Sequence, residues 1–178
     1  MKGCHHDIAA PSAWVVRWSG LVPAGGRVLD IACGNGRHAS FFASRGHPVE
    51  AVDRDSALLA QLAGIAGIST RCADLEGGQW PYPGEEFAGI VVANYLYRPL
   101  FPHLLAALAA GGVLIYETFA AGNERFGRPS NPAFLLKPGE LLEVVRGRLR
   151  VIACEELEVS EPKPAVVQRI CAMSPSVS

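Results

Sequence analysis

The sequence has almost no excess charge, few lysines and no closely spaced cysteines. Its 178 residues include 16 basic and 17 acidic side chains, for a net charge of −1, and only three are lysines. This balance provides no general attraction to nucleic acid or to an anionic membrane. The five cysteines form no C-x-x-C pair, so neither a disulfide framework nor a zinc knuckle is indicated.

Long apolar runs are also missing. No segment reaches the roughly 18 uncharged apolar residues of a membrane span, and the first residues lack the apolar run of a signal peptide. We therefore expect a cytoplasmic protein that binds neither membrane nor nucleic acid. The stretch Cys4–Asp7 contains metal-ligand side chains, but terminal segments seldom hold a metal, so no metal site is predicted.

Strands and helices alternate along most of the chain. A short apolar run predicts a buried strand at 28–31, and further strands are predicted at 48–52, 68–72, 89–93 and 113–117. Helical patterns fall between them at 36–44, 55–62 and 99–109, and a further helix is expected at 139–146. Residues 149–159 and 165–173 predict a terminal antiparallel hairpin. We expect one Rossmann-like, doubly wound α/β domain over 1–178, whose seven-stranded sheet is mostly parallel.

Polar residues lie at or near the ends of the five parallel strands. They are Asp30, Asp53, Asp74, Asn94 and Glu117. Because the carboxyl ends of parallel strands meet at one edge of a sheet, where such folds bind ligands, we expect these side chains to share one site.

A glycine-rich turn follows the first strand, in the stretch V-L-D-I-A-C-G-N-G-R-H-A (28–39). Gly34 and Gly36 allow a ligand to approach the backbone closely. The pattern G-x-G-x-x-A, with Asp53 17 residues after Gly36, suits a dinucleotide. It also suits S-adenosylmethionine, and the motif alone does not separate the two cofactors.

Three features favour S-adenosylmethionine. A carboxylate at Asp30 would repel a pyrophosphate but can help to hold a methionine ammonium. Asp74 is placed to accept a hydrogen bond from an adenine amine, beside the backbone of Leu75. The chain also lacks the second mononucleotide half that a dinucleotide enzyme usually needs.

The turn, Asp53, the pair Asp74-Leu75 and the final hairpin together resemble class I S-adenosylmethionine-dependent methyltransferases. The short chain and the G-N-G-R-H turn resemble the branch that contains tellurite-resistance methyltransferases. The resemblance implies that Gly34 and Gly36 line the methionine moiety, that Asp53 binds the ribose hydroxyls and that Asp74 binds adenine. The remaining cofactor contacts would be Asp30, Ala32, Arg54, Leu75 and Asn94, with S-adenosylhomocysteine as the product.

The acceptor site is expected beyond the fourth and fifth strands. Asn94 occupies the polar position after strand four, but the full [D/N]-P-P-[Y/F] pattern of nitrogen methylators is absent. We expect Tyr95 to wall the acceptor pocket, Arg98 to pair with an anionic substrate and Glu117 to be the best-placed base. Residues 119–138 are a candidate lid over this pocket, and residues 1–26 a helical cap.

The resulting hypothesis is methyl transfer to a small molecule by in-line displacement, carried out by a monomer or homodimer. A nicotinamide-linked oxidoreductase stays open, and so does a non-catalytic module that binds S-adenosylmethionine and regulates a partner. Cys33 at a helix start has two interpretations, a thiol with a lowered pKa and a small side chain packed beneath the turn, and packing is favoured. His38 and His103 are candidate bases, and packing explains them as well.

Overall fold

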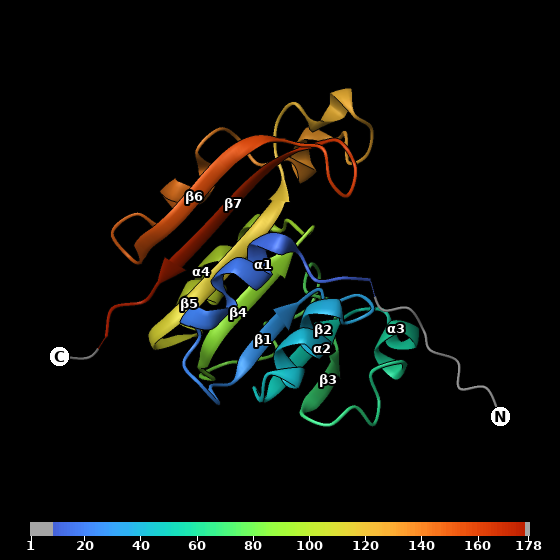
Figure 1. The fold of residues 1–178 in the computed structure, drawn as a ribbon, viewed down its shortest axis with the longest axis vertical. Helices are drawn as coiled ribbons and strands as arrows, with labels where there is room; N and C mark the ends of the chain where they lie inside the picture. The colour runs from blue at the N-terminus through green and yellow to red at the C-terminus, as the bar shows by residue number, and fades with distance from the viewer. Residues whose placement is uncertain (1–8, 177–178) are drawn as a thin grey trace.

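The structure, a computed structural model, describes residues 9–176 and contains one seven-stranded sheet (Figure 1). The strand order is β3-β2-β1-β4-β5-β7-β6. The strands are β1 (Val28–Ile31), β2 (Val49–Asp53), β3 (Ile68–Cys72), β4 (Phe87–Ala93), β5 (Leu108–Phe119), β6 (Arg150–Val159) and β7 (Ala165–Met173).

The first five strands run parallel, and the terminal hairpin adds two antiparallel strands. β1 pairs in parallel with both β2 and β4, β2 pairs with β3, and β4 pairs with β5. β7 lies antiparallel to β5 and to β6. This arrangement confirms the predicted Rossmann-like sheet and its terminal hairpin.

Helices cover both faces of the sheet. They are α1 (Ala13–Trp18), α2 (Arg37–Ser44), α3 (Ser56–Ala60), α4 (Phe101–Ala106) and α5 (Glu140–Val145). The first three lie on one face, and α4 lies behind the sheet in Figure 1. Alternate residues of a strand point to opposite faces, so Val28 packs beneath α1–α3, whereas Leu29 and Ile31 pack with Leu104 of α4.

The helix expected at 99–109 is shorter than predicted. α4 ends at Ala106, and β5 begins at Leu108, which pairs with Phe87 of β4. The Ala107 carbonyl accepts a hydrogen bond from the Phe87 amide (2.8 Å). Pairing across the sheet therefore overrides the helical propensity of the L-A-A-L-A-A segment.

Residues 120–139 form an irregular segment beyond the end of β5, as the sequence predicts. It contains two short 3-10 turns, η3 (Asn123–Arg125) and η4 (Pro132–Phe134), and a single parallel bridge between Ala120 and Leu136. In Figure 1 this segment lies beside the turn between β6 and β7, at the end of the sheet where β5 finishes.

The predicted helical cap is only partly described. α1 and the 3-10 turn η1 (Ser19–Leu21) supply its helical part, and residues 1–8 lie outside the described range, as does the Cys4–Asp7 stretch. Within the described residues, no helix is long and apolar enough to cross a membrane.

Candidate functional site

The glycine-rich turn joins β1 to α2, and its two glycines are required for different reasons. Both have left-handed backbones, with φ of 56° at Gly34 and 74° at Gly36. A β-carbon at Gly34 would meet nothing within 4 Å, whereas one at Gly36 would lie 2.4 Å from Leu62 Cδ2. Of the two, only Gly34 faces open space that a ligand can enter. Packing against Leu62 is by itself a reason for glycine at position 36, and contact of the Gly36 backbone with a ligand stays a prediction.

Asp53, at the end of β2, is bonded to the turn through its carboxylate. One oxygen accepts from the Gly34 amide (2.8 Å), and the other accepts from the Asp55 amide (2.9 Å). Asp55 itself caps α3 by accepting from the Ala57 and Leu58 amides, so Asp53 is not needed as the cap. Each carboxylate oxygen retains lone-pair capacity for a ligand hydroxyl.

A cavity of about 210 Å³ opens beside Asp53, at the carboxyl ends of β1, β2 and β3. Five of the predicted cofactor residues line it, namely Ala32, Asp53, Arg54, Asp74 and Leu75. They come from three different strand ends, so only the fold brings them together. A nucleoside would meet the Asp53 carboxylate and the Leu75 backbone in this cavity.

Tyr95 lies in this first cavity and not where the sequence analysis expected it. Its side chain lines the same space as Asp74, and burial raises the pKa of its phenol. Tyr95 therefore does not line the predicted acceptor pocket. Its neighbour Tyr97 donates to the Glu76 carbonyl (2.7 Å), which holds the 74–76 loop in place.

Asp30 lies beneath the turn, not in either cavity of the site. It is 2% exposed and accepts from the Ala39 amide of α2 (2.9 Å). Burial raises its pKa to about 7, and the Ala39 hydrogen bond only partly opposes this. The structure shows a carboxylate that fixes the start of α2. Contact between Asp30 and a methionine ammonium stays a prediction.

Cys33 is packed beneath the turn, which agrees with the structural interpretation. The thiol is buried, and burial raises its pKa, with Asp30 and Asp53 adding to the effect. A reactive thiolate is therefore disfavoured.

Among the residues that the structure describes, two other than glycine have left-handed backbones, and both lie at the site. Ala32 follows β1 with φ of 50°, and Asn94 follows β4 with φ of 56°. Such conformations cost about 1–2 kcal/mol for residues with a β-carbon. A hydrogen bond from the Asn94 amide to the Glu117 carbonyl (2.9 Å) holds the strained backbone of Asn94 in place.

A second cavity, of about 450 Å³, lies across the ends of β4 and β5 from the first. Asn94 and Glu117, two of the residues predicted to act in the reaction, both line it. Glu117 Oε1 accepts from the Ser12 hydroxyl (2.7 Å), and Glu117 Oε2 lies 3.4 Å from Arg169 Nε. The structure therefore places a carboxylate at this cavity, already partnered by a hydroxyl and a guanidinium.

Several lining residues of this second cavity were missed in the sequence analysis. Residues 9–13 before and at the start of α1 form one wall, and the β6–β7 turn forms another with Lys163. Arg169 of β7 also lines the cavity, over the ring of Trp14 (5.3 Å). The turn sequence E-P-K-P indicated only a hairpin, and no spacing pattern links residues 9–13 to residue 117.

Arg98 does not face the acceptor site, and its predicted role toward a substrate is wrong. Its guanidinium binds both carboxylate oxygens of Glu140 (2.6 and 2.9 Å) and donates to the carbonyls of Ala133 and Leu135. These bonds use all three guanidinium nitrogens. Arg98 is instead a clamp that joins η2 (Arg98–Leu100) to the 132–140 segment.

Neither candidate histidine is placed to act as a base. His38 is buried, its Nε2 accepts from the Ser12 amide (3.1 Å), and burial lowers its pKa to about 4. His103 stacks on Trp80 with ring centroids 5.4 Å apart. His103 and Trp80 line a cavity of about 380 Å³ beside the start of β4, away from the strand ends that form the site.

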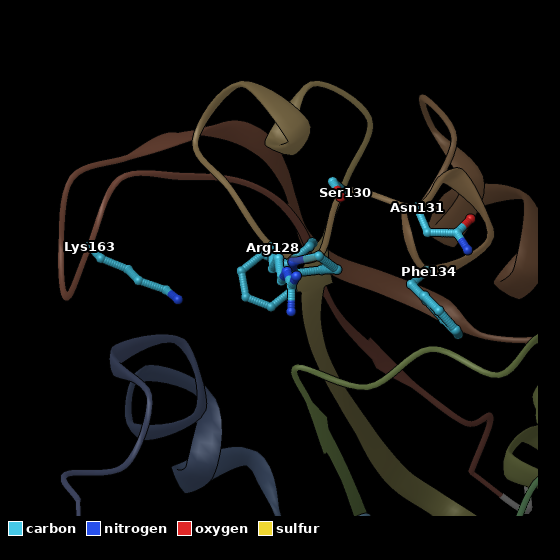
Figure 2. Close-up of a pocket in the computed structure, with 7 residues that line it drawn as sticks. Arg128, Ser130, Asn131, Phe134 and Lys163 are labelled. Carbon is cyan, nitrogen blue, oxygen red and sulfur yellow. The ribbon is translucent and has the colours of Figure 1, made fainter.

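A third cavity, of about 520 Å³, lies within the predicted lid segment (Figure 2). Phe119, Arg128, Pro129 and Phe134 line it, together with Lys163 from the β6–β7 turn. The segment is fastened to the hairpin, because Asn123 accepts from the Val166 amide (3.1 Å) and Arg125 pairs with Glu158. The structure thus shows a packed segment that adjoins the second cavity; whether it opens and closes as a lid stays a prediction.

Comparison with known proteins agrees with this arrangement. Residues 28–112 match the family model described as a methyltransferase domain. This segment contains the turn, Asp53, Asp74 and Asn94. No curated protein sequence matches the chain.

Solved structures share the whole fold at low sequence identity. TehB from Haemophilus influenzae superposes with a TM-score of 0.78 at 19% identity, over 95% of this chain and 64% of that one. A TehB-like S-adenosylmethionine-dependent methyltransferase from Corynebacterium glutamicum gives 0.65 at 22%, over 90% and 86%. The glycopeptide N-methyltransferase MtfA, solved with S-adenosylhomocysteine, gives 0.66 at 18%, over 94% and 91%.

The methyltransferase-domain match covers residues 28–112, and the whole fold is similar to that of solved class I S-adenosylmethionine-dependent methyltransferases. Within that class, it resembles the TehB-like structures, as the turn sequence predicts. The chain spans about two thirds of the length of the Haemophilus TehB. The comparisons give no support to the nicotinamide-linked or the non-catalytic alternative.

Proposed function

We propose that the chain transfers a methyl group from S-adenosylmethionine to a small-molecule acceptor, with the nucleoside in the 210 Å³ cavity and the acceptor in the 450 Å³ cavity. When bound, S-adenosylmethionine supplies an electrophilic methyl group on sulfur. The observation that carries the proposal is the Asp53 carboxylate, which lines the first cavity and accepts from the amide of Gly34, a residue whose β-carbon position is open space.

The residues of the first cavity fit the cofactor. The Asp53 carboxylate is held toward the turn by two amide donors and keeps lone pairs for two hydroxyl groups. Asp74 is exposed at the cavity, where one of its oxygens accepts from the Glu76 amide and the other can accept from an amine. A β-carbon at position 34 would occupy the space that the ligand needs.

The second cavity suits an acceptor because it is walled by apolar side chains yet contains polar groups from two strand ends. The walls formed by Trp14, Phe119 and Val167 remove water from a nucleophile, which raises its reactivity. Asn94 can orient the acceptor by hydrogen bonding. Glu117 is the carboxylate within reach of an acceptor proton, and we assign it the role of base for acceptors that arrive protonated.

Binding and turnover test this proposal together. We expect calorimetry to detect S-adenosylhomocysteine binding, and a panel of thiols, amines and oxyanions to include an acceptor that releases it. Asp53→Ala should weaken binding by about 1–3 kcal/mol through loss of charged hydrogen bonds. Asp53→Asn, which keeps one acceptor oxygen, should weaken it less.

Asp55→Ala is the matched control, since Asp55 caps α3 but lines neither cavity. It should lower the unfolding free energy by about 1 kcal/mol and leave the affinity nearly unchanged. Equal affinity in wild type and Asp53→Ala would contradict the assignment of the nucleoside site. A cytoplasmic location and the absence of nucleic-acid or membrane partners remain predictions from the sequence.

A further inference from the structure

Two cations of the third cavity have no acidic partner among the described residues. Neither Arg128 nor Lys163 forms an ion pair or a side-chain hydrogen bond there, whereas Arg98 and Arg125 of the same region are bound to Glu140 and Glu158. In Figure 2, Lys163 extends from the β6–β7 turn toward Arg128. Two like charges facing one space repel each other unless an anion lies between them.

The rest of this cavity is mostly apolar. Phe119, Pro129 and Phe134 contribute ring surfaces, and its described lining includes no aspartate or glutamate. Phe134 is 50% exposed, which is unusual for a side chain of this size. In Figure 2 it lies on the side of the cavity opposite Lys163. An apolar surface that ends in two unpartnered cations is complementary to an amphipathic anion.

The third cavity adjoins the second cavity, which is the proposed acceptor cavity. Phe119 and Lys163 line both, so the space beside Asn94 and Glu117 continues past these two side chains toward Arg128. Together the two spaces are far larger than an inorganic oxyanion needs. Glu161 lines only the acceptor cavity, and Glu117 is already bonded to Ser12 and faces Arg169.

We propose that the acceptor is an organic anion with an apolar body, whose carboxylate or phosphate binds between Arg128 and Lys163 while its body packs on Phe119 and Phe134. The reacting end then lies in the cavity beside Asn94 and Glu117. This inference rests on the proposed function, and it names the substrate class of that same site. It also makes Arg128 and Lys163 specificity-determining residues.

A pair of unreactive probes tests the inference by binding alone. Biphenyl-4-carboxylate and biphenyl-4-carboxamide share one apolar body and differ in charge. We titrate each into the full chain saturated with S-adenosylhomocysteine, by calorimetry at low salt. The carboxylate should bind at least about tenfold more tightly than the amide, and added salt should weaken only the carboxylate.

Substitutions locate the effect. Arg128→Gln combined with Lys163→Gln should make the two probes bind equally, and Arg148→Gln should retain the wild-type difference. Arg148 is the matched control because it is an exposed cation without an ion pair among the described residues and lines none of these cavities. Equal affinities in the wild type would overturn the inference, and so would a difference that survives the double substitution.

Sodium selenite, an oxyanion without an apolar body, tests whether the aromatic side chains of the third cavity contribute to binding. If selenite binds as tightly as biphenyl-4-carboxylate, the aromatic walls contribute nothing and the organic acceptor is wrong. Failure of the proposed function has a separate signature, which is the absence of S-adenosylhomocysteine binding in the first titration. The probe comparison is then repeated without that ligand, so the anion subsite is still accepted or rejected on its own.

Discussion

At the scale of single residues, the site depends on backbone positions that ordinary residues avoid. Gly34, Ala32 and Asn94 all have left-handed backbones next to the two cavities. The sequence indicated the glycine from its motif, but nothing in it marked Ala32 or Asn94 as strained. Strain at a residue with a β-carbon is imposed by surrounding hydrogen bonds, such as that of the Asn94 amide to Glu117, and these form only in the folded chain.

The two glycines of the turn should respond differently to substitution. Gly34→Ala puts a methyl group into open space, so we expect it to weaken S-adenosylhomocysteine binding at least about tenfold, with about 1–2 kcal/mol of backbone strain. Gly36→Ala should leave binding less affected but destabilise the fold by roughly 2–4 kcal/mol, because strain adds to the collision with Leu62.

Calorimetry and denaturant unfolding measure the two effects. Leu62→Ala removes the colliding atoms, so Gly36→Ala should cost less in that background than in the wild type. If Gly36→Ala abolished binding without lowering stability, the ligand and not Leu62 would occupy the space at Gly36.

Two buried groups give the unfolding free energy opposing dependences on pH. The pKa of Asp30 is about 7 when folded, above its unfolded value, so the folded state binds more protons between about 4 and 7 and this contribution to stability falls as pH rises. The pKa of His38 is about 4 when folded, below its unfolded value near 6.5, so its contribution rises with pH between about 4 and 6.5.

Single substitutions should expose each contribution. Of these two effects only that of His38 remains in Asp30→Asn, and we expect stability to rise more steeply with pH from 4 to 6.5 than in the wild type. In His38→Gln we expect stability to fall from pH 4 to 7. Denaturant unfolding across this range provides the measurement, and curves parallel to that of the wild type for both variants would refute the assignment.

At the scale of elements, the parallel strands and the hairpin were predictable, but the segments between them were not. The strands at 28–31 and 68–72 have the predicted bounds, and the first of them is the buried strand that its apolar run predicts, whereas β3 is mostly exposed. The end of α4 was missed, because it is set by pairing of Leu108 with a distant strand. Arg98 was misassigned for the same reason: its partners lie 35 to 42 residues away.

The Arg98 clamp should determine how firmly the 132–140 segment is held. In Arg98→Ala, Glu140 and the carbonyls of Ala133 and Leu135 lose their donors. We expect amide hydrogen exchange at 131–136 to accelerate and the acceptor KM to rise, with the affinity for S-adenosylhomocysteine unchanged. Arg148→Ala serves as control. Unchanged exchange in Arg98→Ala would show that packing alone holds the segment.

Ser12 should determine how firmly the wall formed by residues 9–13 is held against the second cavity. Its amide donates to His38 and its hydroxyl donates to Glu117. Removing the hydroxyl in Ser12→Ala should raise the acceptor KM by about three- to tenfold and leave cofactor affinity intact. Ser19→Ala, which removes a hydroxyl bonded only to the Val16 carbonyl, is the comparison; an equal effect in both variants would mean a general loss of helix stability.

At the scale of the whole molecule, the parallel part of the sheet brings the ends of five strands to one edge. The first cavity, where we propose that the nucleoside binds, lies at the ends of β1, β2 and β3. The second cavity, proposed for the acceptor, lies at the ends of β4 and β5. The sequence predicted that polar residues at or near the strand ends would meet at this edge, with an acceptor site beyond the fourth and fifth strands. It did not predict that the chain before α1 and the β6–β7 turn would close the second cavity, since no local pattern marks such contacts; the bond from Ser12 to Glu117 spans 105 positions.

A crystal structure of the chain with S-adenosylhomocysteine tests the central claim most directly. We predict adenine and ribose in the 210 Å³ cavity, with the ribose hydroxyls about 2.6–3.2 Å from the Asp53 carboxylate, and the homocysteine end passing over Gly34 toward Asn94. A ligand bound elsewhere, or a ribose that makes no contact with Asp53, would contradict the account.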